Sequence, residues 1–205
     1  MSISKEDAIK HANSIVKKVL KDYNLLSEVL KSVRAKEDSI RYPNAIALEI
    51  LSEKHPEIIY PEWDFLLDLL KSKNAYHKSI AISTIANLTF IDDKKKFNTI
   101  FKKFFDLIDD KSVVVARKLA IYSGRIAKAK PSLRTKITEI LLQIDKTKHN
   151  TNRKDLIKGD IIESFSEYFK DIKVKNDVLE FVKTQLDSTS PSTIKKAKNF
   201  LKKWE

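Results

Sequence analysis

Apolar residues recur at intervals of three or four along almost the whole chain, and this periodicity constrains the fold more than any other sequence feature. The clearest segment runs from Asp93 to Asp109. Six apolar residues there fall at i, i+3, i+4, i+7, i+8 and i+11, namely Phe97, Ile100, Phe101, Phe104, Phe105 and Ile108. Only a helix of about 3.6 residues per turn puts all six on one face. The pattern therefore predicts an amphipathic helix over about 94–108.

The same periodicity predicts eleven helices in total. The breaks between the periodic segments contain proline or residues that cap helices, such as Asp92–Asp93 and the run Thr189-Ser190-Pro191. Because the connections are short, neighbouring helices are expected to run antiparallel. The predicted helices cover about residues 4–21, 24–35, 41–54, 61–72, 75–88, 94–108, 112–128, 131–145, 153–169, 175–187 and 191–204.

Composition excludes several other classes of protein. The 205 residues include only two glycines, whereas β-sandwiches and nucleotide-binding α/β folds need glycine at many turns. With no cysteine, the chain has no disulfide, zinc–thiolate site or thiol chemistry. The charged N-terminus does not resemble a signal peptide, and no apolar run reaches the length of a membrane span. A cytoplasmic location and no membrane span are therefore expected.

An alanine recurs in successive odd-numbered helices, between large apolar residues in three of them and between Lys196 and Lys198 in the last. Ala47, Ala81, Ala120 and Ala197 mark four of them, and Ile161 marks a divergent one, with spacings of 34, 39, 41 and 36 residues. A small residue at a fixed position allows the next helix to pack closely. One helix pair cannot bury its apolar face alone, so repeated pairs of this kind are expected to stack in a row.

One of these units resembles a HEAT repeat. The segment from Asp110 to Ala127 has an acidic residue in the turn, then apolar residues, then Arg117, as the first helix of that family does. Pro131 and the apolar set Leu133, Ile137, Ile140, Leu141 and Ile144 match the second helix, whereas the tetratricopeptide signature is absent. The resemblance covers residues 38–205 loosely and 110–145 well. It implies an all-α fold, a right-handed α–α superhelix of about five helix pairs plus a C-terminal capping helix, as a single domain over residues 1–205.

No combination of residues indicates catalysis, a cofactor or a metal. The four histidines, His11, His55, His77 and His149, are scattered and are expected at the surface. No phosphate-binding or nucleophile motif occurs, and acidic pairs such as Asp92–Asp93 flank helices, where carboxylates stabilise N-termini. The sequence therefore predicts a non-enzymatic protein with no cofactor, no metal and no evident small-molecule substrate.

Positive charge is concentrated in one predicted repeat. Of the formal net charge of +12, residues 112–150 carry +7, with nine basic and two acidic residues, whereas residues 39–73 carry −2. Within the first helix of the basic repeat, Arg117, Lys118, Arg125 and Lys128 fall within about 100° of one another, opposite the apolar face. Arg134 and Lys136 follow in the next helix. These six residues are the candidate anion- or macromolecule-binding set, and a solvated helix face is the alternative.

Two functions from different classes fit this reading. The first is a scaffold that binds another macromolecule, in the first place a protein, through an extended helical surface. The second is nucleic-acid binding through the basic repeat at 112–154, by contact with the phosphate backbone. One version of it follows from the resemblance, because some HEAT-like proteins are alkylpurine DNA glycosylases that use a carboxylate beside aromatic residues. Trp63 and Asp64 are the one tryptophan–acid neighbour pair, although adjacent helical residues point about 100° apart.

Overall fold

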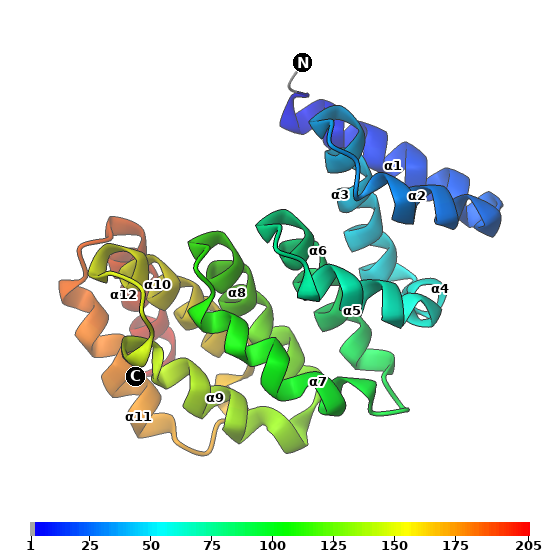
Figure 1. The fold of residues 1–205 in the computed structure, drawn as a ribbon. Coiled ribbons are helices and arrows are strands. Elements are labelled where there is room, and N and C mark those ends of the chain that lie inside the picture. The colour runs from blue at the N-terminus through cyan, green and yellow to red at the C-terminus, as the bar shows by residue number, and fades with distance from the viewer. Residues whose placement is uncertain (1–2) are drawn as a thin grey trace. The chain divides into compact units, whose positions relative to one another are not determined.

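The computed structural model describes residues 3–205, and over that range it contains helices and turns without a strand (Figure 1). The all-α prediction is confirmed. Tertiary contacts divide the chain into two compact units, residues 1–91 and residues 92–205, and each is described by itself. The continuous right-handed superhelix, the single domain over residues 1–205 and the HEAT-repeat family stay predictions.

The N-terminal unit arranges its helices in two layers (Figure 1). Helix α3 packs against both α1 and α6, whereas α2 packs on α3 and α5 packs on α6. The repeat alanines Ala47 and Ala81 lie on α3 and α6 and are fully buried. The elements in chain order are α1 (Lys5–Lys21), η1 (Tyr23–Leu25), α2 (Leu26–Ser32), α3 (Asp38–Lys54), α4 (Pro56–Ile59), η2 (Tyr60–Glu62), α5 (Trp63–Lys71), α6 (Ala75–Leu88) and η3 (Thr89–Ile91).

The C-terminal unit repeats this arrangement with a second set of helices (Figure 1). Helix α10 packs against both α8 and α12, and α9 packs against α8 and α11. Ala120, Ile161 and Ala197 lie on α8, α10 and α12 and are fully buried. The elements are α7 (Lys96–Phe105), η4 (Asp106–Asp109), α8 (Val113–Ala129), η5 (Pro131–Leu133), α9 (Arg134–Leu142), η6 (Ile144–Lys146), α10 (Thr151–Tyr168), η7 (Phe169–Asp171), α11 (Lys175–Thr184), η8 (Gln185–Asp187) and α12 (Pro191–Trp204).

Two glycines bring the inner helices of the C-terminal unit into close approach. A Cβ atom added to Gly124 on α8 would lie 2.6 Å from the backbone oxygen of Ser164 on α10. One added to Gly159 on α10 would lie 2.4 Å from Oγ1 of Thr193 on α12. Real Cβ atoms do not approach so closely, so both chain glycines serve helix contacts and neither lies in a turn.

Helix α7 begins at a cap that the sequence only partly predicts. The buried carboxylate of Asp92 accepts hydrogen bonds from the backbone nitrogens of Lys96 and Phe97, at 2.8 and 3.0 Å. Nζ of Lys130 lies 3.1 Å from the same carboxylate. Asp92 thus stabilises the first turn of α7 and ties it to the end of α8.

Several predicted helix boundaries need correction. The helices at 75–88 and 191–204 are as predicted, but α3 begins at Asp38, before the predicted start at 41. The predicted helix at 94–108 begins at Lys96, because Lys95 has a left-handed φ of 54°, and continues as the 3-10 segment η4 after Phe105. The predicted helix at 131–145 has 3-10 turns at both ends of α9. Short turns of this kind satisfy the end groups of helices and have no distinct apolar period.

None of the helices formed by residues 3–205 combines the length and the apolar character needed to cross a lipid bilayer.

Candidate interaction surface

The outward face of α8 combines basic and aliphatic side chains. Val114, Lys118, Ile121, Arg125 and Lys128 follow one another at helical spacing and lie on the side away from the buried residues Val115, Leu119 and Ile126. Val114 is 59% exposed and Ile121 is 38% exposed. Lys118 places its Nζ 4.7 Å from the centre of the Tyr122 ring, a cation–π contact. The predicted basic side of this helix is therefore a mixed surface.

A buried carboxylate on the next helix pairs with the first of the candidate residues. Oδ2 of Asp160 on α10 accepts a hydrogen bond from Nε of Arg117 at 2.7 Å, and the Asp160 side chain is only 2% exposed. The hydrogen bond to Asp160 raises the pKa of Arg117 and outweighs the effect of partial burial. Arg117 is thus held as a cation by a partner within the protein.

The same carboxylate also binds a lysine from α12, which packs on the other side of α10 from α8. Nζ of Lys196 on α12 lies 3.0 Å from Oδ1 of Asp160 and 2.9 Å from Oε2 of Glu163. Burial alone lowers the pKa of Lys196, but the hydrogen bonds to Glu163 and Asp160 leave it raised. Asp160 therefore lies between two cations, and opposite charges alternate from α8 through α10 to α12.

A third carboxylate of α10 faces the remaining basic residues of α8. Loss of solvation raises the pKa of Glu167, and the positive charges of Lys128 and Arg125 partly offset that rise. Asp160, Glu163 and Glu167 follow one another at helical spacing, in line with the exposed Leu156 on α10. We call the residues Val114, Arg117, Lys118, Ile121, Arg125, Lys128, Leu156, Asp160, Glu163, Glu167 and Lys196 the inner face of the C-terminal unit.

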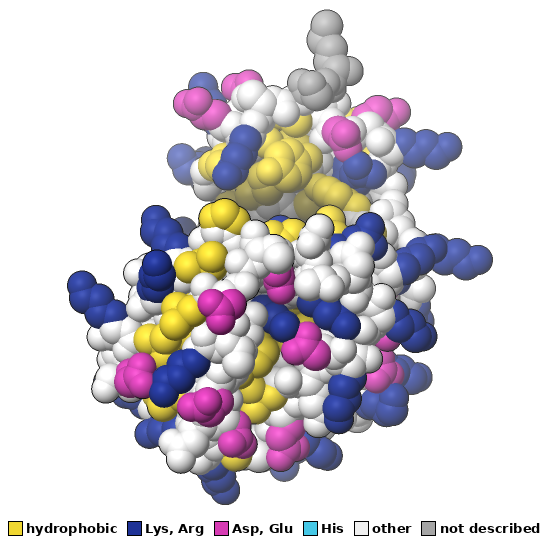
Figure 2. Space-filling model, turned by 90° about the vertical axis from the view of Figure 1, so that its left-hand side faces the viewer, with side chains coloured by type: hydrophobic (Ala, Val, Ile, Leu, Met, Phe, Trp, Pro, Cys, Tyr) yellow, Lys and Arg dark blue, Asp and Glu magenta, His cyan; other side chains and the backbone are white. Residues whose placement is uncertain are grey.

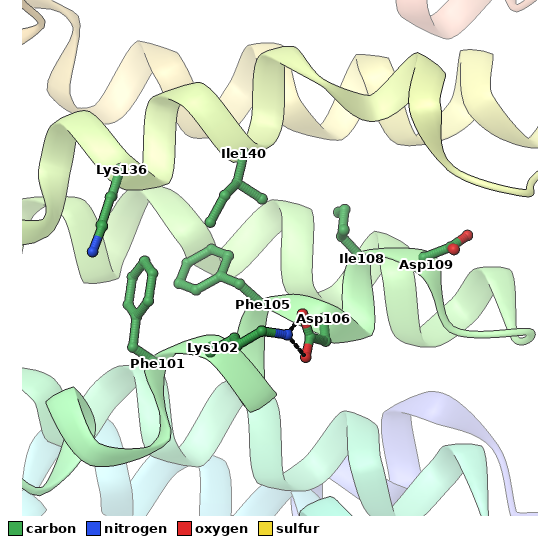
Figure 3. Close-up of a pocket in the computed structure, with 8 residues that line it drawn as sticks. All are labelled: Phe101, Lys102, Phe105, Asp106, Ile108, Asp109, Lys136 and Ile140. Carbon is green, nitrogen blue, oxygen red and sulfur yellow. Dashed lines mark hydrogen bonds and ion pairs between the residues drawn. The ribbon is translucent and has the colours of Figure 1, made fainter.

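The six candidate residues do not form a single strip. Arg134 turns toward α8 and η7, where its Nε donates to the backbone oxygen of Ala127 at 3.1 Å and its Nη1 lies 3.7 Å from the Asp171 carboxylate. Lys136 lies on α9 and borders a groove between α9 and α7 (Figure 3). The structure therefore brings Arg117, Lys118, Arg125 and Lys128 together on α8 and places Lys136 on another surface.

Acidic and basic groups are also interspersed elsewhere on this unit. Figure 2 shows Lys, Arg, Asp and Glu side chains mingled over the side of the C-terminal unit that it presents, without a large region of one sign. A count of charge by repeat assigns the acidic residues of α10 to the repeat after the basic one. In the folded chain, however, they pack beside the basic residues of α8. No pattern within residues 112–150 reveals that neighbour.

The residues considered for chemistry do not come together. Trp63 is buried on α5 beside Tyr60, with ring centres 5.7 Å apart, whereas Asp64 is exposed. His149 is buried, contrary to the prediction that the histidines lie at the surface, and its Nε2 lies 3.0 Å from the backbone oxygen of Ile108. Within residues 3–205, no three His, Asp or Glu side chains are grouped as metal ligands would be.

The fold and this surface together define an all-helical protein with charged, ion-paired helix faces. No family model matches the chain, and no curated protein matches it. Among solved structures, the chain is similar to the crystal structure of an engineered protein, a structural genomics target, with a TM-score of 0.52. The two are 16% identical, and the match covers 97% of this chain and 88% of the other. At that identity the likeness supports the fold alone.

Proposed function

We propose that the chain is a non-enzymatic interaction protein that binds a protein partner through the inner face of the C-terminal unit. The alternation of charge across α8, α10 and α12, with aliphatic side chains beside it, carries the proposal. Protein interfaces combine apolar anchors with complementary charges of both signs. Val114, Ile121 and Leu156 supply the anchors here, and the resemblance to HEAT repeats fits the same use of an extended helical surface.

The alternative is nucleic-acid binding through residues 112–154. A phosphate backbone is uniformly negative, so it is repelled by the carboxylates of Glu163 and Glu167 beside the basic residues. Arg117 is already paired with Asp160. The inner face therefore favours a protein partner over a polyphosphate.

Site-specific photo-crosslinking tests the proposal. A photoreactive residue replaces Ile121 on the inner face and, as a matched control, the exposed Ser132 in η5. We expect the Ile121 position to give a discrete adduct whose size nuclease leaves unchanged, and the Ser132 position to give none. In Val114→Asp the adduct should be lost, because a carboxylate in place of an exposed aliphatic anchor opposes burial at an interface.

Adducts that nuclease removes would contradict the proposal and support the nucleic-acid alternative. That alternative also makes a quantitative prediction: with four or five phosphate contacts, log affinity for a DNA duplex should fall with log salt at a slope of about −4. The variant that tests it reverses Lys118, Arg125 and Lys128 to Glu. Arg117 is left unchanged because its reversal would place a carboxylate against the buried Asp160.

A further inference from the structure

An apolar groove opens between α7 and α9, away from the inner face (Figure 3). Its volume is about 590 Å³, within the range of sites that hold small ligands or peptide side chains. Phe105, Ile108 and Ile140 form the floor and Phe101 forms a wall, and Figure 3 shows Ile140 and Phe105 pointing toward one another. No residue of α8, α10 or α12 lines it.

The groove lies where α7 and α9, two outer helices of this unit, make few close contacts with each other. Phe101 and Phe105 stack on each other with ring centres 4.8 Å apart, and Phe101 remains only half-buried. The apolar stripe of α7 that the sequence predicts is therefore not fully covered by the chain's own helices.

The two ends of the groove carry opposite charges. Lys136 extends from α9 toward Phe101 at one end, and it makes no hydrogen bond or ion pair with any residue that the structure describes (Figure 3). Asp109 lies at the other end, where its carboxylate accepts a hydrogen bond from the backbone nitrogen of Lys148. Lys102 and Asp106 pair with each other along the rim, at 2.8 Å. An occupant is thus offered the cation of Lys136 at the Phe101 end and the carboxylate of Asp109 at the Ile108 end.

We propose that this groove binds a short helical segment of a partner protein. The segment presents two apolar side chains about one turn apart, with a carboxylate beside Lys136 and a basic residue toward Asp109. The nine residues from Phe101 to Asp109 span roughly 12 Å along the helix axis, which is about two turns of a bound helix. Apolar anchors at helical spacing, flanked by charges that match the rim, are the usual features of helix-in-groove recognition.

A designed peptide provides the probe. We use a capped, alanine-based peptide of roughly 16 residues, long enough to be partly helical, with Glu, Leu, Leu and Lys at i, i+3, i+7 and i+10. Binding is followed by the methyl NMR signals of isoleucine. We expect saturable shifts of the Ile108 and Ile140 signals, which line the groove, and no shift of Ile121, which lies on the inner face.

A charge swap separates recognition from a general loss of structure. Lys136→Glu should weaken binding about fivefold, as expected when an exposed attraction becomes a repulsion, and the peptide with Lys in place of Glu should restore it. Thr135→Glu, an exposed neighbour that does not line the groove, is the control and should leave binding unchanged.

The proposal is overturned if the Ile108 and Ile140 signals do not shift, if Ile121 responds instead, or if both peptides bind the wild type and Lys136→Glu equally. Because the groove and the inner face share no residue, silent Ile108 and Ile140 signals would leave the protein-binding role proposed for the inner face untouched. A response at Ile121 would instead place the bound peptide on the inner face.

Discussion

At the residue scale, Asp160 determines what the basic residues of α8 can do. Its buried carboxylate binds Arg117 and Lys196 on two different helices, so it links α8 and α12 through α10. A buried acid with two cationic partners is stabilising only as a set, since removal of the acid leaves Arg117 without its carboxylate partner and Lys196 with Glu163 alone. The pairing that reduces the positive field of the inner face therefore also contributes to folding.

Asp160→Asn should destabilise the protein by about 1–3 kcal/mol. Breaking a fully buried ion pair costs more, but Arg117 is partly solvated, so the loss here should be smaller. Urea unfolding followed by circular dichroism measures the change. The control, Glu163→Gln, removes a half-exposed partner of Lys196 and should cost less than about 1 kcal/mol. Equal stabilities of Asp160→Asn and the wild type would show that the two ion pairs contribute nothing.

A second carboxylate, Asp155, fixes the turn that leads into α12. It accepts hydrogen bonds from the backbone nitrogen and Oγ1 of Thr189, at 2.8 and 2.6 Å. Burial alone raises the pKa of Asp155, but the hydrogen bonds from Thr189 and Ser188 lower it below its usual value of 3.8. These bonds favour the charged form of the carboxyl group.

The pH dependence of stability follows from that lowered pKa. Since the folded pKa of Asp155 is depressed, its contribution is present above pH 3.8 and is lost as the pH falls through the lower folded value. The free energy of unfolding of Asp155→Asn should therefore fall less steeply than that of the wild type as the pH drops below 3.8. Urea unfolding at a series of acidic pH values measures both slopes. Parallel slopes would contradict a lowered pKa of Asp155 in the folded protein.

At the element scale, the packing of α8 on α10 depends on a glycine that sequence reasoning overlooked. The alanine repeat correctly marks buried positions on five helices. However, α8 also approaches α10 closely at Gly124, which lies one helical turn after Ala120 and has the backbone oxygen of Ser164 opposite it. A single glycine within a helix gives no periodic signal, so only the neighbouring helix explains it.

Gly124→Ala should destabilise the protein by about 1–3 kcal/mol, because the new methyl group meets a backbone oxygen that cannot rotate away. Helix propensity alone predicts that Gly124→Ala stabilises the protein, since alanine is favoured over glycine by about 1 kcal/mol within a helix. Thermal and urea unfolding decide between the two. Asn152→Ala, at an exposed position on α10, is the control and should be close to neutral. A stabilised Gly124→Ala variant would mean that α8 and α10 lie farther apart.

The sequence predicts the helices better than it predicts their surfaces. Period and cap residues place most helices correctly, because an amphipathic helix is determined by residues close together in the chain. Helix α12 illustrates the limit: Ile194, Ala197 and Leu201 form an apolar stripe in its sequence, yet Thr193, Ala197 and Phe200 are its buried residues. Phe200 packs on Phe169, with ring centres 5.0 Å apart, and such a partner from a distant segment is not visible locally.

At the scale of the whole molecule, a net charge of +12 does not by itself define an anion-binding surface. Counting by repeat places the excess in residues 112–150, but folding sets those residues beside the carboxylates of α10. Lys136, from the same segment, faces a different groove. Charge density along the chain therefore predicts net attraction to acidic partners, whereas the kind of partner depends on which residues of the next helix lie alongside.

Duplex DNA binding by a variant with a neutralised α10 tests this account most directly. If Glu163 and Glu167 keep the inner face from acting as a polyphosphate site, the double variant Glu163→Gln, Glu167→Gln should bind DNA more tightly than the wild type. Its salt slope should be steeper by about one to two. Fluorescence anisotropy over a range of salt concentrations measures both quantities. A wild type that already binds with a slope of about −4, with no change in the double variant, would contradict the account.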